Sequence, residues 1–179
     1  MKKNLLNKIF NYFISGIIIL MASCTYNPPP EAEEAPSQKE VDMIKVNEYL
    51  NIQDRRLIEK YIQRAGWDMK ETETGLWYTL HDPGEGEKAR KGMVATLAYK
   101  SLLLDGTLVY SSEKLGEKRF KLGQGGVETG LEEGLLLLNK GDSATFILAP
   151  HLAHGLIGDQ KKIPPRAALI YHVRLLNLE

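Results

Sequence analysis

The sequence has little cysteine and no surplus of charge, and each shortage excludes a class of protein. Cys24 is the only cysteine among the 179 residues. One cysteine cannot form a disulfide within the chain or complete a cysteine-based zinc site. Basic and acidic residues number 23 each, so the chain lacks the positive charge that attracts nucleic acid. We therefore expect no nucleic-acid partner.

Common catalytic and metal-binding motifs are also missing. The glycine-rich stretch 123–126 lacks the Gly-Lys-Ser/Thr ending of a phosphate loop. Ser111 and Ser112 stand outside any Gly-x-Ser-x-Gly turn, which activates a nucleophilic serine. His151 and His154 have a spacing that could chelate a metal on a helix, but no cysteine or Glu-His pairing supports them. We expect no metal, no cofactor and no covalent catalysis.

Residues 1–23 predict an export signal. Lys2, Lys3 and Lys8 precede an apolar run of about eleven residues, well short of the roughly twenty that span a bilayer. Removing these lysines leaves 20 basic residues against 23 acidic ones. Small residues directly before Cys24 resemble the lipobox of bacterial lipoproteins, in which the cysteine is acylated. We expect a lipid-anchored protein of the cell envelope, at the outer membrane or periplasmic face, with the cell surface or an ordinary cleaved signal as alternatives.

Residues 24–39 predict a tether and residues 40–67 a helical arm. Four prolines favour extended backbone in the tether, and its glutamates keep it solvated. The arm should contain two helical segments, the second starting at Asn51 or Asp54. Its apolar stripe either packs on its own domain or serves self-association or client binding. The stripe comprises Ile44, Leu50, Leu57, Ile58, Tyr61 and Ile62.

A short leucine-rich helix stands at the centre of the remaining chain. Thr129 can cap it, and Glu132 three residues later would complete a capping box. Segments on both sides of this helix have strand patterns. A mostly buried helix among strands must be covered by a sheet, which is the only large apolar surface available. The residues on its apolar face are Val127, Leu131, Leu135 and Leu138.

Alternating and apolar runs indicate the strands. In the last of them, Leu169, Tyr171 and Val173 should point inward, with His172 outward. Asp105-Gly106 predicts a hairpin with a type I′ turn. A polar loop should cover 111–118 and a long loop 150–165. The expected strands are 76–80, 93–103, 108–110, 120–122, 143–149 and 168–176.

Several of these features coincide in a family pattern. They are Tyr99, Asp105-Gly106, Ser111-Ser112, Phe120-x-Leu122-Gly123, the 130–134 stretch Gly-Leu-Glu-Glu-Gly, Gly141, Pro150, Ala153-x-Gly155, the 163–165 stretch Ile-Pro-Pro and the closing strand. In this order they resemble the FK506-binding-protein (FKBP) type of peptidyl-prolyl cis-trans isomerase, over residues 75–179. The resemblance implies an α+β fold, an antiparallel sheet curled around one short central helix and preceded by the N-terminal helical segment. The signal, tether and arm resemble exported lipoproteins of this family, including those linked to gliding motility.

The resemblance implies rotation about X-Pro bonds in exported polypeptides. The partial double bond makes this rotation cost about 18–20 kcal/mol. An apolar pocket disfavours the charge-separated planar amide, and a backbone N–H can bind the substrate carbonyl. The partners expected are proline-containing polypeptides, the membrane through Cys24, and a second copy through the arm.

Ten residues are expected at the substrate pocket. Several differ from the usual family type, and the departures concentrate there. Glu128 stands where an aliphatic residue supplies the N–H, Leu131 replaces a tryptophan, and Lys118 lies near a position that is usually aromatic. Isomerase activity and a non-catalytic chaperone or envelope-complex module therefore both remain open. The pocket residues are Tyr99, Val109, Tyr110, Phe120, Val127, Glu128, Leu131, His154, Ile163 and Tyr171.

Overall fold

The computed structural model of this protein describes residues 38–179. The expected signal at 1–23, the acylation site Cys24 and nearly all of the tether lie outside the described residues. Within 38–179, no helix is both long and apolar enough to cross a membrane.

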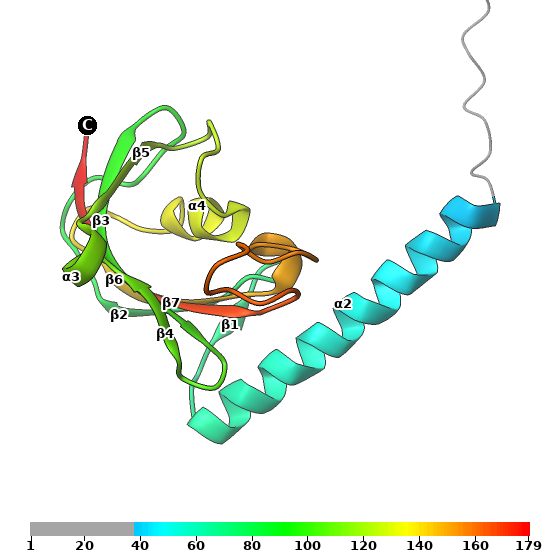
Figure 1. The fold of residues 1–179 in the computed structure, drawn as a ribbon. Coiled ribbons are helices and arrows are strands. Elements are labelled where there is room, and N and C mark those ends of the chain that lie inside the picture. Colours follow the sequence, from blue (N-terminus) through cyan, green and yellow to red (C-terminus); the bar gives the residue numbers. More distant parts are fainter. Residues whose placement is uncertain (1–37) are drawn as a thin grey trace, which may run out of the picture. The chain divides into compact units, whose positions relative to one another are not determined.

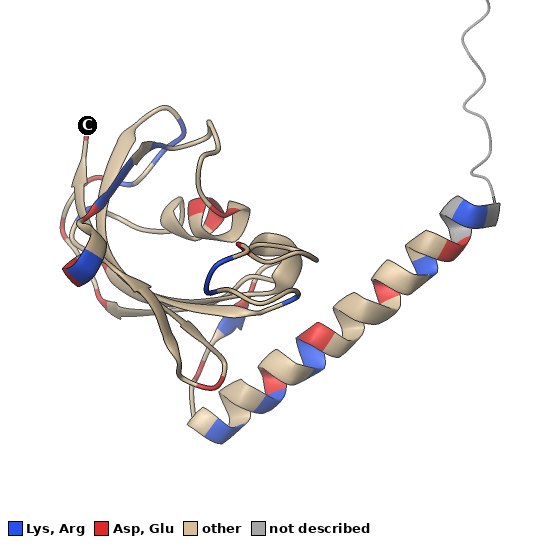
Figure 2. Cartoon of the chain, in the orientation of Figure 1, with Lys and Arg blue, Asp and Glu red and all other residues tan. Residues whose placement is uncertain are grey.

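The arm is one continuous helix, α2, from Gln38–Ala65, so the prediction of two segments is wrong. No glycine or proline interrupts this stretch. The expected cap Asp54 is instead a buried mid-helix residue whose carboxylate accepts a hydrogen bond from Arg166 at 2.7 Å. The helix ends at Gly66, whose φ of 66° lies in the left-handed region. Charges of both signs lie along α2 (Figure 2).

The two halves of α2 have different surroundings. Ile58 and Ile62 are buried in a cluster with Ile147, Ala149 and Ile170 of the sheet. The expected packing of the arm on its own domain is therefore confirmed for this C-terminal half. Six large apolar side chains of the helix are exposed instead, four of them in its N-terminal half: Met43, Ile44, Val46, Tyr49, Ile52 and Leu57.

A seven-stranded antiparallel sheet forms the body of the fold and curls around α4 (Figure 1). This confirms the predicted fold class. The strand order is β1-β2-β6-β7-β3-β4, and β5 also pairs with β3. The strands are β1 Lys70–Glu71, β2 Trp77–Asp82, β3 Val94–Leu103, β4 Leu108–Ser111, β5 Lys118–Lys121, β6 Ser143–Leu148 and β7 Leu169–Leu178. The remaining helices are α3 Ser112–Leu115, α4 Thr129–Leu135 and the 3₁₀ helix η2 Pro150–Leu152.

Two local expectations change with the structure. The β3–β4 hairpin is present, but only Gly106 has positive φ, so the turn is not type I′. The register between these strands also shifts. Ser101 pairs with Tyr110 and Leu102 with Leu108, so β4 contains one additional residue, Val109, at this point. The expected loop 111–118 contains α3, and Lys118 already belongs to β5. The inward and outward alternation of β7 is confirmed.

Helix α4 lies against β6 because two of its residues are glycines. A Cβ added to Gly134 would lie 2.7 Å from the Phe146 ring, and one added to Gly130 would lie 2.8 Å from Leu148. This close approach buries Leu131 completely. The predicted capping box is wrong, because both of its side chains bond outside the helix start. The Thr129 hydroxyl donates to the Leu152 carbonyl, and the Glu132 carboxylate accepts from the Gly123 N–H.

Candidate active site

The predicted pocket residues converge between the start of α4, strands β3 and β7, and the loop that follows β6. The rings of Tyr99 and Tyr171 lie 6.2 Å apart, centre to centre. Leu131, Val109 and Ile163 are buried in the same cluster. The partly buried side chains of Phe120, Val127 and Tyr110 pack against it. The apolar members of the predicted set therefore belong to, or pack against, one core cluster that includes α4.

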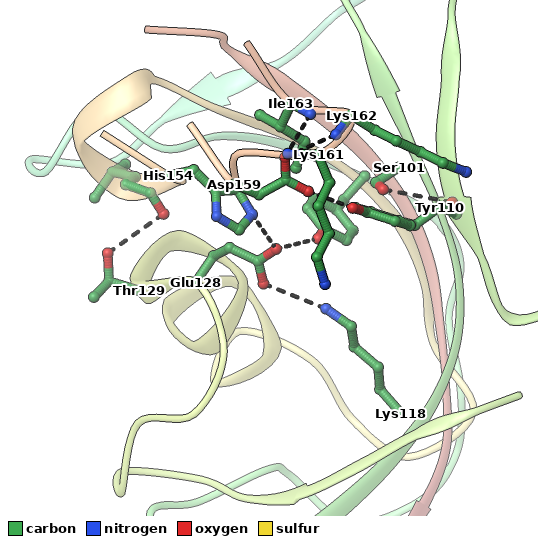
Figure 3. Close-up of polar contacts among 12 residues, drawn as sticks. Ser101, Tyr110, Lys118, Glu128, Thr129, His154, Asp159, Lys161, Lys162 and Ile163 are labelled. Carbon is green, nitrogen blue, oxygen red and sulfur yellow. Dashed lines mark hydrogen bonds and ion pairs between the residues drawn. The ribbon is translucent and has the colours of Figure 1, made fainter. Parts of the chain in front are cut away.

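The mouth of this cluster is closed by the side chain of Glu128, which is only 7% exposed. The Tyr171 hydroxyl donates to Oε1 of Glu128 at 2.5 Å, and His154 Nε2 lies 3.1 Å from the same oxygen. Lys118 Nζ lies 3.4 Å from Oε2 (Figure 3). The site therefore differs from the shallow apolar pocket that the resemblance implied. Its hollow of about 340 Å³ is lined by Lys118, Gly126, Val127, Glu128, Ala153 and His154.

Lys118 is held by aromatic faces as well as by Glu128. Its Nζ lies 4.9 Å from the centre of the Tyr99 ring and 5.6 Å from that of Tyr171, within reach of both π-faces. Lys118 is not among the ten residues predicted for the pocket, although it was placed near a position that is usually aromatic. The available signal was its position two residues before Phe120, because residues two apart on a strand share a face.

Four neighbouring groups keep the Glu128 carboxyl ionised. Burial by itself raises the pKa of this carboxyl. The charge of Lys118, the Tyr171 hydroxyl, Glu128's own backbone N–H and His154 outweigh it, so the pKa lies below its usual value. Burial and the adjacent carboxylate raise the pKa of Tyr171. The backbone N–H expected to bind a substrate carbonyl thus belongs to the same residue as this buried carboxylate.

A second polar pair orders the loop beside the site. The Tyr110 hydroxyl donates to Asp159 Oδ2, and Oδ1 of Asp159 accepts the backbone N–H groups of Lys161, Lys162 and Ile163 at 2.7–2.9 Å (Figure 3). The hydrogen bond to Asp159, together with burial, raises the pKa of Tyr110 to about 12. Burial alone would raise the pKa of Asp159. The four hydrogen-bond donors outweigh burial, so the pKa of Asp159 lies below its usual value. Sequence reasoning missed Asp159 as a site residue, because its contact with a predicted pocket residue is to Tyr110, 49 positions away.

Comparison with known proteins decides the family. Residues 85–176 match the family model "FKBP-type peptidyl-prolyl cis-trans isomerase", which is more than half of the chain. This chain belongs to that family. FK506-binding protein 1 of Dictyostelium discoideum is 31% identical over 106 residues, 59% of this chain and 99% of that protein.

Two bacterial relatives are longer proteins. The probable FkpA isomerase of Neisseria meningitidis is 37% identical over 111 residues, 62% of this chain and 40% of its own length. The probable FKBP-type isomerase of Haemophilus influenzae is 34% identical over 114 residues, 63% of this chain and 46% of its length. The matched part thus spans less than half of either relative.

Solved FKBP structures share the fold. The crystal structure of AtFKBP13 gives a TM-score of 0.60 at 26% identity, covering 63% of this chain and 99% of that one. The crystal structure of FkpA from Escherichia coli gives a TM-score of 0.63 at 24% identity, covering 94% and 81% respectively.

Within the FKBP pattern, the unusual residues of this chain compensate one another. The resemblance predicts that Glu128 and His154 depart from the usual residue types of the pocket, that Lys118 lies near a usually aromatic position, and that Tyr171 replaces a phenylalanine. In the structure the other three all contact the Glu128 carboxylate. One charge introduced alone into an apolar pocket would be costly, whereas a paired and hydrogen-bonded group is tolerated. The departures therefore form one polar network rather than separate losses.

Proposed function

We propose that this protein is a peptidyl-prolyl cis-trans isomerase that rotates X-Pro bonds in exported polypeptides. Family membership supports this function, since FKBP-type proteins are peptidyl-prolyl isomerases. The observation that carries the proposal is the convergence of Tyr99, Leu131, Tyr171 and Ile163 at the start of α4, beside the backbone of Glu128. These walls suit a proline ring and exclude water.

Catalysis in this proposal is by binding alone. The proline ring enters the cluster when the Glu128 side chain turns out toward solvent. This movement releases the Glu128 backbone N–H for a substrate carbonyl, and the apolar walls disfavour the planar, charge-separated amide. Displacing the carboxylate breaks hydrogen bonds to a charged group, each worth about 1.5–3 kcal/mol. The rate should therefore be lower than in a pocket with an aliphatic residue at position 128.

An isomerase assay on X-Pro peptides tests the proposal. The unmodified chain should accelerate exchange for at least one X. Glu128→Ile removes the competing carboxylate and should raise kcat/KM about tenfold, equivalent to about 1.4 kcal/mol of barrier. Glu133→Ile provides a matched control on α4, because Glu133 bonds to Thr74 outside the pocket network. No rate above background for any X, in either the unmodified chain or Glu128→Ile, would reject the proposal.

The closed mouth favours a second candidate, a non-catalytic chaperone or envelope-complex binding module. The buried Glu128 carboxylate contacts Lys118, Tyr171 and His154 in the place where we expect a proline to enter. This function would appear as suppressed aggregation of an unfolded client, or capture of one defined partner, with no isomerase activity. The decisive comparison is with Glu128→Ile, which should not alter client protection if the pocket is unused.

We also propose that acylated Cys24 anchors the protein in the cell envelope, at the outer membrane or the periplasmic face, or alternatively at the cell surface. The pattern that supports the anchor is the positive, apolar and small-residue order before the only cysteine. Clients would then be exported polypeptides.

A further inference from the structure

We propose that the proline site prefers polypeptides with an acidic residue immediately before the proline, and that Lys118 sets this preference. The inference rests on the proposed isomerase function and names the substrate class for it. It follows from what substrate binding must displace.

Lys118 is an unusual cation for an apolar site. Its side chain is 28% exposed, and its ammonium lies above the rings of Tyr99 and Tyr171, which the proposal assigns to the walls of the proline pocket. It forms an ion pair with the Glu128 carboxylate, 3.4 Å away. The charge of Lys118 is therefore at the mouth of the pocket, not on the outer face of the sheet.

Substrate entry would remove that partner. When Glu128 turns out, the Lys118 ammonium loses its carboxylate and the Tyr171 hydroxyl loses its acceptor. An apolar residue before the proline would leave both groups unsatisfied in a partly desolvated place, which costs free energy. A glutamate or aspartate before the proline could supply a carboxylate to the position that Glu128 vacates. A carboxylate of the substrate then replaces the carboxylate of Glu128.

The other charges of the rim favour the same substrate. Lys161 and Lys162 lie on the loop that Asp159 ties to Tyr110 (Figure 3). Basic colour marks this loop and β5 in Figure 2. Asp159, the other carboxylate of the rim, already accepts four hydrogen bonds. Three lysines, Lys118, Lys161 and Lys162, thus surround the proposed pocket together with two carboxylates. Of these carboxylates, Glu128 must leave its position when substrate binds.

The test compares peptides Ala-X-Pro-Phe with X as Glu, Gln, Leu or Lys, using the full chain and its variants. In the unmodified chain, kcat/KM for Glu should exceed that for Gln about fivefold and that for Lys more than tenfold, and added salt should reduce both ratios. Lys118→Met keeps the aliphatic stem above the rings and should bring the Glu-to-Gln ratio to about one. Lys118→Arg keeps the charge and should keep the preference, which separates a charge effect from misfolding. Lys121→Met, on an exposed position of the same strand, is the matched control and should change nothing.

The failure of this inference differs from that of the proposed function. The preference would be overturned if kcat/KM for the Leu or Lys peptide equalled that for the Glu peptide. An unchanged Glu-to-Gln ratio in Lys118→Met would also overturn it. Both results would leave the isomerase proposal intact. If no peptide is turned over, the isomerase proposal fails, and fluorescence anisotropy with labelled forms of the same peptides decides the preference. Tighter binding of the Glu peptide that is lost in Lys118→Met would support it. Equal binding of all four, or none, would overturn it.

Discussion

The site depends on one ionised side chain, Glu128, and on the donors around it. Its carboxylate is almost completely buried, yet Lys118, Tyr171 and His154 all contact it. A buried charge with this many partners is stable, but removing one partner leaves it undersatisfied. Each residue of the network should therefore matter more in the presence of Glu128 than in its absence.

Tyr171→Phe tests this dependence, because it keeps the ring but removes a donor to the carboxylate. We expect the free energy of unfolding to fall by about 1–3 kcal/mol, the cost of an unsatisfied buried polar group. Urea denaturation measures it. In the Glu128→Ile background the same substitution should cost much less. An equal cost in both backgrounds would show that the hydroxyl and the carboxylate are not coupled.

The pH dependence of stability should contain a contribution from Glu128. Its pKa in the folded protein lies below the unfolded value, about 4.3, so the folded state favours the ionised form. This stabilisation is fully present above the unfolded pKa and is lost as the pH falls through the folded pKa. Melting temperatures of the unmodified chain and Glu128→Gln should differ most near pH 7 and converge between pH 5 and 3. A difference independent of pH would assign the effect to packing.

At the scale of elements, α4 is positioned by glycines that contact the sheet. Gly134→Ala would normally favour a helix by about 1 kcal/mol. Here the new Cβ would lie 2.7 Å from the Phe146 ring, so we expect a net loss of about 1–3 kcal/mol through overpacking. Thermal and urea unfolding measure it. The double variant Gly134→Ala with Phe146→Leu should recover part of the loss, and a stabilised single variant would contradict the close packing.

The N-terminal half of α2 carries exposed apolar side chains, and we propose that it mediates self-association. Ile44, Val46 and Tyr49 are each more than half exposed, and a concentration of exposed apolar side chains is typical of interaction surfaces. The full chain without its signal should be a dimer or larger by light scattering. Ile44→Glu should shift it toward monomer, whereas Lys45→Glu at the neighbouring position should not. A monomeric unmodified chain at high concentration would contradict the proposal.

Local patterns predicted the elements better than they predicted the site. The alternation of β7 and the apolar face of α4 were evident in the sequence, because each depends on periodicity within one segment. The continuity of α2 was missed, because the role of Asp54 depends on Arg166, 112 positions away. The contacts that bring Lys118 and Asp159 to the site were missed for the same reason. Lys118 meets Glu128 and two tyrosines of other strands, and Asp159 meets Tyr110, 49 positions away.

At the scale of the whole molecule, the proposed function depends on location, since exported polypeptides are accessible only to an exported isomerase. Cys24 lies outside the described residues, so the argument for the anchor is chemical. Each buried methylene of an acyl chain contributes about 0.8 kcal/mol, so several chains on one residue would hold the protein firmly at a membrane.

Cys24→Ser removes the acylated sulfur and should move the protein from the membrane to the soluble fraction of fractionated cells. Ser23→Ala keeps a small residue before the cysteine, and this variant should stay bound. Intact-mass measurement of the membrane form should show acyl groups, and a Cys24→Ser protein that stays membrane-bound would contradict the anchor. Because the residues proposed for the pocket all lie within 99–171, the released Cys24→Ser protein should keep the proposed activity on peptides, which separates the location of the protein from its catalysis.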